Sequence, residues 1–577
     1  MAAIREQLER ASGDHWLHLG SCAAAVEEAL AQLEARGASD AIWGRHGELW
    51  SDDPQEAREI EQRLGWLDLP DTMRIETPRL EALALELQAA GIRRALLLGM
   101  GGSSLAPEVL RSVFGVAPGL IDVTVLDATD PEQIARVERQ DDLEATAFIA
   151  ASKSGTTAET RTLMEYFAGQ LEPIVGGEWP RHFIVITDPG TPLATLAQDE
   201  GLRACYINPP DVGGRYSALS LFGLVPAALN GADCRRLLRS ARAMAHRCRA
   251  SVPDRENPAA VLGAILGACA RQGRDKLTLL TSPSLASMGW WVEQLIAEST
   301  GKDGKGIVPV EGEPPMDLAR YGEDRLFVYV RRRDDANEAT DDLAARLAEA
   351  GHPVVALPLD DPYDLGGEFF RWEFATAIAG YLLSINPFDQ PNVDAAKERA
   401  LQALERYEET GQLDAAKPAL REGRLAVYRG EAQADTITAY LEQFLGGARP
   451  GDYVALMAYV DRNEANEAAL QRIRQAIGER LGLAVTVGFG PRFLHSTGQI
   501  HKGGPNTGLF LQITHTGELD LEIPGRGYSF GVLKASQAAG DLAALRDRER
   551  RVVRVDLQGS VDEGLGELER ALNQALA

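Results

Sequence analysis

The sequence lacks the features that would place the protein in a membrane or on nucleic acid. It has no run of about 18 apolar residues, which is the length that a membrane-spanning helix needs. Its 85 acidic residues outnumber its 59 basic ones, and the net charge of −26 argues against nucleic acid or an anionic membrane as a partner. The first residues are charged and contain no apolar signal core. We therefore expect a cytoplasmic protein, and any site for an anion must be a local positive pocket.

Cysteine and histidine are also scarce. The five cysteines are unevenly spaced and include no Cys-x-x-Cys pair, which is typical of reduced thiols and offers no framework for a metal. Of the nine histidines, His495 and His501 lie six residues apart in a Gly-rich stretch, 490–508. We expect no metal site.

What remains is an ordinary globular composition, with 45% hydrophobic and 25% charged residues in 577. That length predicts three or four domains. Apolar strands alternate with helices in two successive stretches, and such strands are typical of parallel sheets covered on both faces. The predicted division is a helical segment at 1–75, α/β domains at 76–250 and 251–400, a helical connector at 401–445, and a smaller α/β domain at 446–577.

One loop carries the strongest chemical signal. The strand Ala147–Ala150 leads into a hydroxyl-rich turn, Ser152-Lys153-Ser154-Gly155-Thr156-Thr157, which opens a helix. Free N–H groups and the positive dipole end favour an anion at such a helix start, and hydroxyl groups suit phosphate oxygens. The Walker spacing is absent. The alternative is an ordinary turn whose Ser and Thr side chains cap the helix.

Two more Gly-rich loops are candidates for the same site, because ligands lie beyond the carboxyl ends of parallel strands. The first, Gly99–Ser104, lets backbone approach a ligand, but it lacks the third glycine of a dinucleotide fingerprint, so we do not expect NAD. The second places Arg215 after Gly213 and Gly214, where it turns either toward an oxyanion or into a surface salt bridge.

Glu298 follows an apolar helical stretch, where burial would raise its pKa and suit it as a base; the alternative is an ordinary charged residue at a helix end. Gln390 and Lys397 are seven residues apart, so they share a helix face, by function or by chance.

Together these segments resemble the glucose-6-phosphate isomerase family. The motifs Gly99–Ser103, Ser152–Thr157, Gly213–Ser217, Gln294–Lys302 and Phe388–Lys397 occur in the family's order over roughly residues 45–400. Segments 490–506 and 528–534 are similar to the isomerase half of fused transaldolase–isomerase proteins. The barrel of a transaldolase, which needs about 200 residues, has no room before the first α/β unit.

The resemblance implies two sugar-isomerase (SIS) type, doubly wound parallel-sheet domains, a phosphosugar substrate, no cofactor and a homodimer. It implies Glu298 as the base that moves a proton between C1 and C2 through a cis-enediol, Arg215 as the stabiliser of the enediolate, and Lys397 as an aid to ring opening. The residues implied in substrate binding are Gly101, Gly102, Ser103, Ser152, Lys153, Ser154, Thr156, Thr157, Gln294 and Gln390.

One departure concerns the group that opens the sugar ring. Many members of the family have a histidine for this step, and here Glu368 stands in its place. A carboxylate could do acid–base work there. A second hypothesis is that His495 or His501 reaches the sugar, across a dimer interface if need be; the alternative is a loop histidine bonded to backbone.

We therefore predict a glucose-6-phosphate isomerase of glycolysis and gluconeogenesis. One alternative is an isomerase on the same scaffold that also takes mannose 6-phosphate, since the phosphate loop does not distinguish hexoses. Another is a non-catalytic phosphosugar-binding regulator, against which Glu298, Arg215 and Lys397 together argue.

Overall fold

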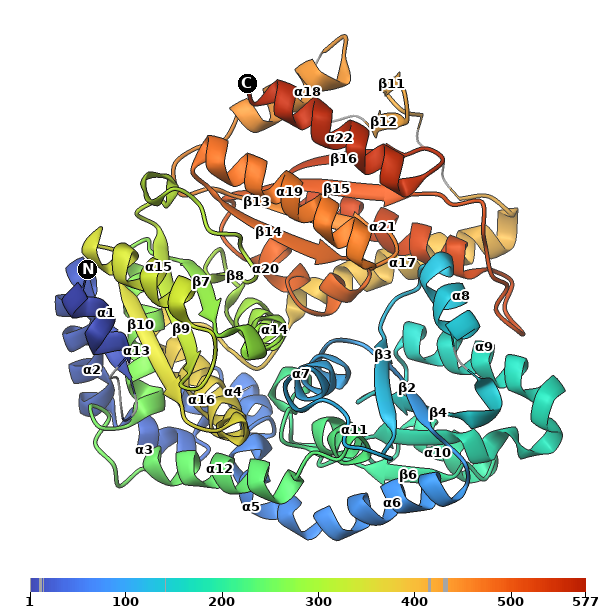
Figure 1. Ribbon diagram of the computed structural model, residues 1–577, viewed down its shortest axis with the longest axis horizontal. Coiled ribbons are helices and arrows are strands. Elements are labelled where there is room, and N and C mark those ends of the chain that lie inside the picture. Colours follow the sequence, from blue (N-terminus) through green and yellow to red (C-terminus); the bar gives the residue numbers. More distant parts are fainter. Residues whose placement is uncertain (1, 10–12, 14, 141, 414–416, 429–433) are drawn as a thin grey trace.

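Three α/β units make up the molecule, each built on its own sheet (Figure 1). The computed structural model describes residues 2–9, 13, 15–140, 142–413, 417–428 and 434–577. In the described part of the chain, no helix is long and apolar enough to cross a membrane.

The first unit has a fully parallel sheet of five strands in the order β3-β2-β4-β5-β6. Its central strands are buried apolar runs, as expected for a sheet covered on both faces. The strands are β2 (Arg94–Gly99), β3 (Asp122–Leu126), β4 (Thr146–Ala151), β5 (Phe183–Thr187) and β6 (Ala204–Ile207); the helices are α6 (Thr77–Ala89), α7 (Leu105–Phe114), α8 (Pro131–Gln140), α9 (Ala158–Val175), α10 (Pro192–Asp199) and α11 (Leu221–Asn230).

The second unit has the order β1-β10-β9-β7-β8, in which β1 is antiparallel to β10 and the others are parallel. The strands are β1 (Trp16–His18), β7 (Lys276–Thr281), β8 (Val308–Val310), β9 (Arg325–Arg332) and β10 (Val354–Leu359). The helices are α1 (Ala2–Glu9), α2 (Ala23–Arg36), α3 (Ala38–Trp43), α4 (Pro54–Glu61), α5 (Leu69–Thr72), α12 (Cys234–Arg247), α13 (Pro258–Arg271), α14 (Met288–Thr300), α15 (Glu338–Glu349) and α16 (Leu365–Leu383).

The third unit has the order β11-β12-β16-β15-β13-β14, with an antiparallel hairpin at one edge of four parallel strands. The strands are β11 (Leu420–Glu422), β12 (Leu425–Tyr428), β13 (Tyr453–Tyr459), β14 (Ala484–Phe489), β15 (Gly508–His515) and β16 (Arg551–Leu557). The helices are α17 (Pro391–Thr410), α18 (Ile437–Gly446), α19 (Glu464–Leu481), α20 (Gly498–Gly503), α21 (Phe530–Asp547) and α22 (Val561–Ala575).

The parallel strands of all three sheets follow one connection pattern. In each unit, the second parallel strand along the chain lies on one side of the first. The third and fourth parallel strands lie, in that order, on the other side of the first. In this doubly wound arrangement the order reverses between the first and third strands, and a crevice forms there beyond the carboxyl ends. The predicted α/β class with parallel-sheet domains is confirmed.

Two predicted helical stretches also contribute strands. β1, from the segment 1–75, extends the second sheet, while β11 and β12, from the segment 401–445, extend the third. These strands have only three or four residues each, too short to show an alternating pattern in the sequence.

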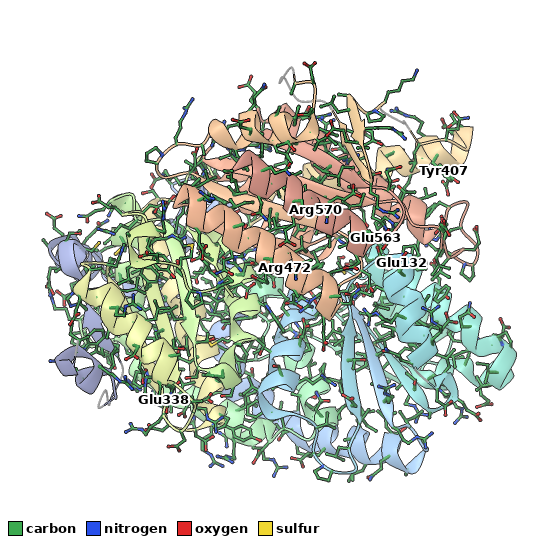
Figure 2. The ribbon with its side chains drawn as sticks, turned by 45° about the horizontal axis from the view of Figure 1, so that its top comes forward. Glu132, Glu338, Tyr407, Arg472, Glu563 and Arg570 are labelled. Atoms are coloured by element: carbon green, nitrogen blue, oxygen red, sulfur yellow. The ribbon has the colours of Figure 1, made fainter. Side chains whose placement is uncertain are left out.

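The third unit packs against the first through charged and polar contacts. Lys534 on α21 pairs with Asp130 at 2.8 Å, and Arg136 on α8 pairs with Asp461 at 2.8 Å. Figure 2 shows Glu132 on α8 beside this boundary, and a Cβ atom built on Gly517 would lie 3.0 Å from its carboxylate. The approach is therefore close, and the third unit forms part of the surroundings of the first sheet's carboxyl edge.

Candidate active site

The reversal point of the first sheet lies between β2 and β4, so the loops Gly99–Ser103 and Ser152–Thr157 follow neighbouring strands. The loop around Arg215 packs directly against the first of them. A Cβ atom on Gly102 would lie only 2.0 Å from the carbonyl oxygen of Gly214, and Ser217 Oγ donates to the carbonyl of Gly102 at 3.2 Å. Glycine is required at position 102 because the two backbones touch. Three predicted site segments therefore meet at one sheet edge.

The hydroxyl-rich loop forms a compact turn at the start of α9. The hydroxyls of Ser152 and Thr157 lie 2.8 Å apart, as do those of Ser154 and Thr156. Ser152 Oγ also accepts the N–H of Gly155 at 3.1 Å. The side chain of Thr157, at the N-cap position, makes no capping hydrogen bond to the first turn of α9, so the N–H groups there keep the donor capacity that an anion uses.

The side chain of Lys153 does not join these hydroxyls. Its ammonium donates to the carboxylate of Asp188 and, at 2.9 Å, to the carbonyl of Pro210. The charge of Lys153 is therefore engaged away from the hydroxyl groups of the loop.

Arg215 is buried, with 3% of its side chain exposed, and is held on every side. Its Nε donates to Ser299 Oγ at 2.7 Å, and Nη2 donates to the carbonyls of Pro387 and Asp389 at 2.7 and 2.8 Å. Its Nη1 donates to Gln390 Oε1 at 3.1 Å. This rigid anchoring excludes the surface salt bridge considered from the sequence and points the cation inward.

Glu298, near the end of α14, meets that cation. Its Oε1 lies 3.3 Å from Arg215 Nη1, and its Oε2 accepts Nε2 of Gln294 at 3.0 Å. Gln294 is one helical turn earlier on the same face, and it also reaches the first Gly-rich loop. A Cβ atom on Gly101 would lie 2.8 Å from Gln294 Nε2, which connects the carboxylate to the sheet edge. The side chain of Glu298 is 13% exposed, so it is open to a small ligand while largely shielded from water.

Several residues of the site were not singled out from the sequence, although they lie next to the motifs. The hydroxyl of Tyr216 lies 3.3 Å from Ser299 Oγ, and the two brace Arg215. Lys302 is buried, donates to the carbonyl of Asn386 and pairs with Asp389 at 2.7 Å. Burial, with a further contribution from the charge of Arg215, lowers the pKa of Lys302 to about 7. The signal that could have revealed them is their adjacency to Arg215 and Glu298.

Lys397 lies on α17 with an exposed side chain. Its charge acts on the carboxylate of Glu159, the second residue of α9, and helps to lower the pKa of that group. Lys397 therefore lies near the start of α9, which follows the hydroxyl-rich loop.

Glu368 has a different neighbourhood. It is buried on α16 and its Oε1 lies 3.3 Å from Arg371 Nη2 on the same helix. Burial above all raises the pKa of Glu368, with opposing contributions from Arg371 and Arg247. The glycines just before it pack on α12, where a Cβ on Gly366 would lie 2.1 Å from the carbonyl oxygen of Leu237. In the described residues, no hydrogen bond or ion pair joins Glu368 to Glu298 or Arg215.

The two histidines of the Gly-rich stretch have opposite surroundings. His501 is buried on α20 among Tyr453, Phe493 and Phe510, at ring-centroid distances of 6.5, 6.2 and 5.1 Å. Burial lowers the pKa of its imidazole well below the usual value. His495 instead lies beside Gly101, and its carbonyl accepts Gln294 Nε2 at 2.9 Å.

Within the described residues, no group of three or more His, Cys, Asp or Glu side chains is arranged to hold a metal ion. The guanidinium of Arg215 places a fixed positive charge beside Glu298. The arrangement pairs an anion-binding helix start with a shielded carboxylate and a fixed positive charge, which is suited to proton transfer on a phosphorylated carbonyl compound.

The sequence model of the phosphoglucose isomerase family matches residues 85–308, a range that includes the hydroxyl-rich loop, Arg215 and Glu298. A glucose-6-phosphate isomerase of Thermus thermophilus is 33% identical over 376 residues, covering 58% of this chain and 88% of the relative. A glucose-6-phosphate isomerase of Symbiobacterium thermophilum is 34% identical over 387 residues, covering 58% and 85%.

Two solved structures are similar to this chain in fold. A hypothetical protein of Thermus thermophilus is 29% identical with a TM-score of 0.57, covering 69% of this chain and all of that one. A glucose-6-phosphate isomerase of Chlamydia trachomatis shares the fold at 18% identity and a TM-score of 0.52, covering 71% of this chain and 95% of its own. The chain thus belongs to the glucose-6-phosphate isomerase family.

Proposed function

We propose that the protein interconverts glucose 6-phosphate and fructose 6-phosphate, with Glu298 as the base that carries the proton. The observation that carries the proposal is the pair of Glu298 and Arg215, 3.3 Å apart and linked through Gln294 to the sheet edge where the hydroxyl-rich loop begins. A pure binding protein would need the loop alone.

The chemistry requires one base that reaches two adjacent carbons. Glu298 removes the C2 proton of the open aldose and returns a proton to C1 of the enediol, giving the ketose. Its position, largely shielded by α14 and the loop of Gly101, keeps bulk water away from the intermediate. No electron leaves the substrate, so the reaction itself needs no redox cofactor.

Arg215 supplies the positive charge that the enediolate oxygens need. Because Ser299, Gln390 and two carbonyls fix its guanidinium, little reorganisation accompanies the reaction. The neighbouring Lys302, whose pKa is about 7, is a second group close to the same negative charge. Gln294 and Gln390 orient the carboxylate and the guanidinium, respectively.

The phosphate group would bind at the start of α9. Ser152, Ser154 and Thr157 offer hydroxyls there, the backbone at Lys153 and Thr156 offers donors, and Ser103 lies on the neighbouring loop. The free N–H groups of the first turn add to them.

A coupled assay of the purified protein tests the proposal. Glucose 6-phosphate should be converted to fructose 6-phosphate, with incorporation of solvent deuterium at C2 of recovered aldose because Glu298 exchanges its proton with water. Mannose 6-phosphate, run in parallel, tests whether the pocket also takes the C2 epimer. Binding of the sugar phosphates without turnover or exchange would instead identify a regulator and contradict the proposal.

The remaining predictions follow from this activity. We propose a role in glycolysis and gluconeogenesis and a place in the cytoplasm, and the homodimer stays a prediction.

A further inference from the structure

A hydrogen-bonded histidine–carboxylate pair joins the third unit to the helix of the hydroxyl-rich loop. His495 ends the short helical turn Arg492–His495 after β14, and its Nε2 lies 3.0 Å from Oε1 of Glu159. Glu159 is in the first turn of α9, two residues after Thr157. The pair is therefore built from segments 336 residues apart and sits beside the proposed phosphate site.

The backbone of His495 is tied to the other end of the site. Gln294 Nε2 donates both to the carbonyl of His495, at 2.9 Å, and to Oε2 of Glu298, at 3.0 Å. A Cβ atom on Gly101 would lie 3.0 Å from Cβ of His495. His495 thus stands between Glu298 and the start of α9, where the middle of a bound sugar phosphate would lie.

The carboxylate partner is prepared to hold an imidazolium. Glu159 is buried, and Gln537 Nε2 donates to its Oε1 at 2.7 Å. Burial tends to raise the pKa of Glu159, but the charge and hydrogen bond of His495, a backbone hydrogen bond and the charge of Lys397 together leave that pKa below its usual value. The imidazole itself is 16% exposed, so a ligand can reach its ring.

The segment that carries His495 is clamped between the other two units. Arg492 pairs with Glu108 at 2.6 Å and with Asp127 at 3.1 Å, both in the first unit. Gln499 Nε2 donates at 2.8 Å to the carbonyl of Gly301, just after α14. Such contacts fix the position of a catalytic side chain.

The other two candidates for ring opening are placed elsewhere. Glu368 is buried against Arg371 and α12, and His501 is buried in the aromatic core of the third unit. In the described part of the chain, neither of them is joined to Glu298 by a hydrogen bond or an ion pair. In contrast, Gln294 links His495 to Glu298, because its Nε2 donates both to the backbone carbonyl of His495 and to the carboxylate of Glu298.

We propose that His495, held by Glu159, is the acid that opens the sugar ring, so that the third unit completes the active site; this rests on the proposed isomerase function. The imidazolium gives its proton to the ring oxygen O5 as the C1–O5 bond breaks and its electron pair goes to O5. The O1 hydroxyl proton passes to water, and the electrons of that bond form the C1 carbonyl. His495 then regains a proton from water, and nothing is oxidised or reduced.

The experiment separates ring opening from isomerisation. Ring opening by itself interconverts the α and β anomers of glucose 6-phosphate, which exchange NMR measures without any isomerisation. The Glu298→Gln enzyme should retain this anomer exchange while losing isomerisation. Adding His495→Gln, whose amide can still donate to Glu159, should reduce the exchange about 100-fold or more.

His495→Gln alone should lower the turnover of cyclic glucose 6-phosphate by a similar factor, with little change in the binding of the sugar phosphate. His515→Gln is the control, since His515 is a buried histidine of the third unit whose Nε2 lies 2.7 Å from the carbonyl of Gly559, away from the proposed site. It should leave both rates unchanged. If His495→Gln lowers the yield of folded protein, Glu159→Gln removes the same dyad from the other side.

Equal anomer exchange with and without His495 would overturn the proposal, as would a complete loss of exchange in Glu298→Gln, which would assign ring opening to Glu298. Failure of the isomerase proposal looks different, because the wild-type protein would then convert no glucose 6-phosphate at all.

Discussion

The two ends of the proposed site are assembled in different ways. The phosphate end is local: Ser152, Ser154, Thr156 and Thr157 lie within six residues and bond mostly to one another. The end around Glu298 is assembled from distant segments, since Arg215 alone contacts residues 84 to 175 positions away. A local turn is specified by its own sequence, whereas the distant end depends on how three sheets pack. The first end should therefore govern binding and the second should govern chemistry.

The largest effect is expected from Glu298→Gln. The amide keeps the size of the side chain and can still bond to Gln294, but it cannot accept the C2 proton. We expect kcat to fall by about 10²- to 10⁴-fold, the range of a lost general base, while the dissociation constant of fructose 6-phosphate stays near that of the wild type. Steady-state kinetics and calorimetric binding measure the two effects.

The control is Glu338→Gln on α15, an exposed carboxylate on the second unit, away from the third (Figure 2). Its kinetics should match those of the wild type. Equal turnover of the Glu298→Gln enzyme would remove Glu298 from the role of base.

A smaller effect, of a different kind, is expected from Thr157→Val. The change removes a hydroxyl but keeps the shape, so the loop loses one donor to the phosphate. A hydrogen bond to a charged group contributes about 1.5–3 kcal/mol, and we expect KM to rise about 10-fold or more with kcat nearly unchanged. Thr195→Val on α10, whose hydroxyl donates to the carbonyl of Thr191, should change neither constant. A fall in kcat with unchanged KM would contradict the division of roles.

The same contrast explains what could be predicted from the sequence. Strand, hydroxyl-rich turn and helix start are consecutive, so their geometry follows from local patterns. The motif order also identified the segments that meet around Glu298. The grouping of Arg215 with Gln390, through Pro387 and Asp389, depends on tertiary packing and has no local signal.

The two histidines show where sequence reasoning stops. His495 and His501 lie in one Gly-rich stretch and looked equivalent, yet one faces the first unit and the other an aromatic core. The difference arises because the short helix α20, which carries His501, is buried inside the third unit, whereas His495 precedes it. Spacing within the stretch could not show which histidine reaches the carboxyl edge of another sheet.

The smallest expected effect concerns Glu293 on α14, whose carboxylate faces Ser496 of the third unit. Glu293, next to Gln294, has its pKa raised to about 8 by burial and by the nearby Glu311, against the opposing charges of Arg492 and Arg474. The folded protein then binds a proton that the unfolded chain loses near pH 4.5. Stability from this group is complete below pH 4.5 and is lost as pH rises toward 8, at no more than about 1.4 kcal/mol per pH unit.

Glu293→Gln should therefore flatten the fall in the free energy of unfolding between pH 6 and 8, as measured by urea titration at several pH values. The amide is neutral at every pH and keeps the packing of α14 against the third unit, so the variant should match the wild type near pH 4.5 and exceed its stability at pH 6 and, by a larger margin, at pH 8. Turnover should fall far less than in Glu298→Gln, because the carboxylate of Glu293 accepts from Ser496 rather than binding Glu298 or Arg215. An unchanged pH slope would show that Glu293 does not hold the extra proton in the folded protein.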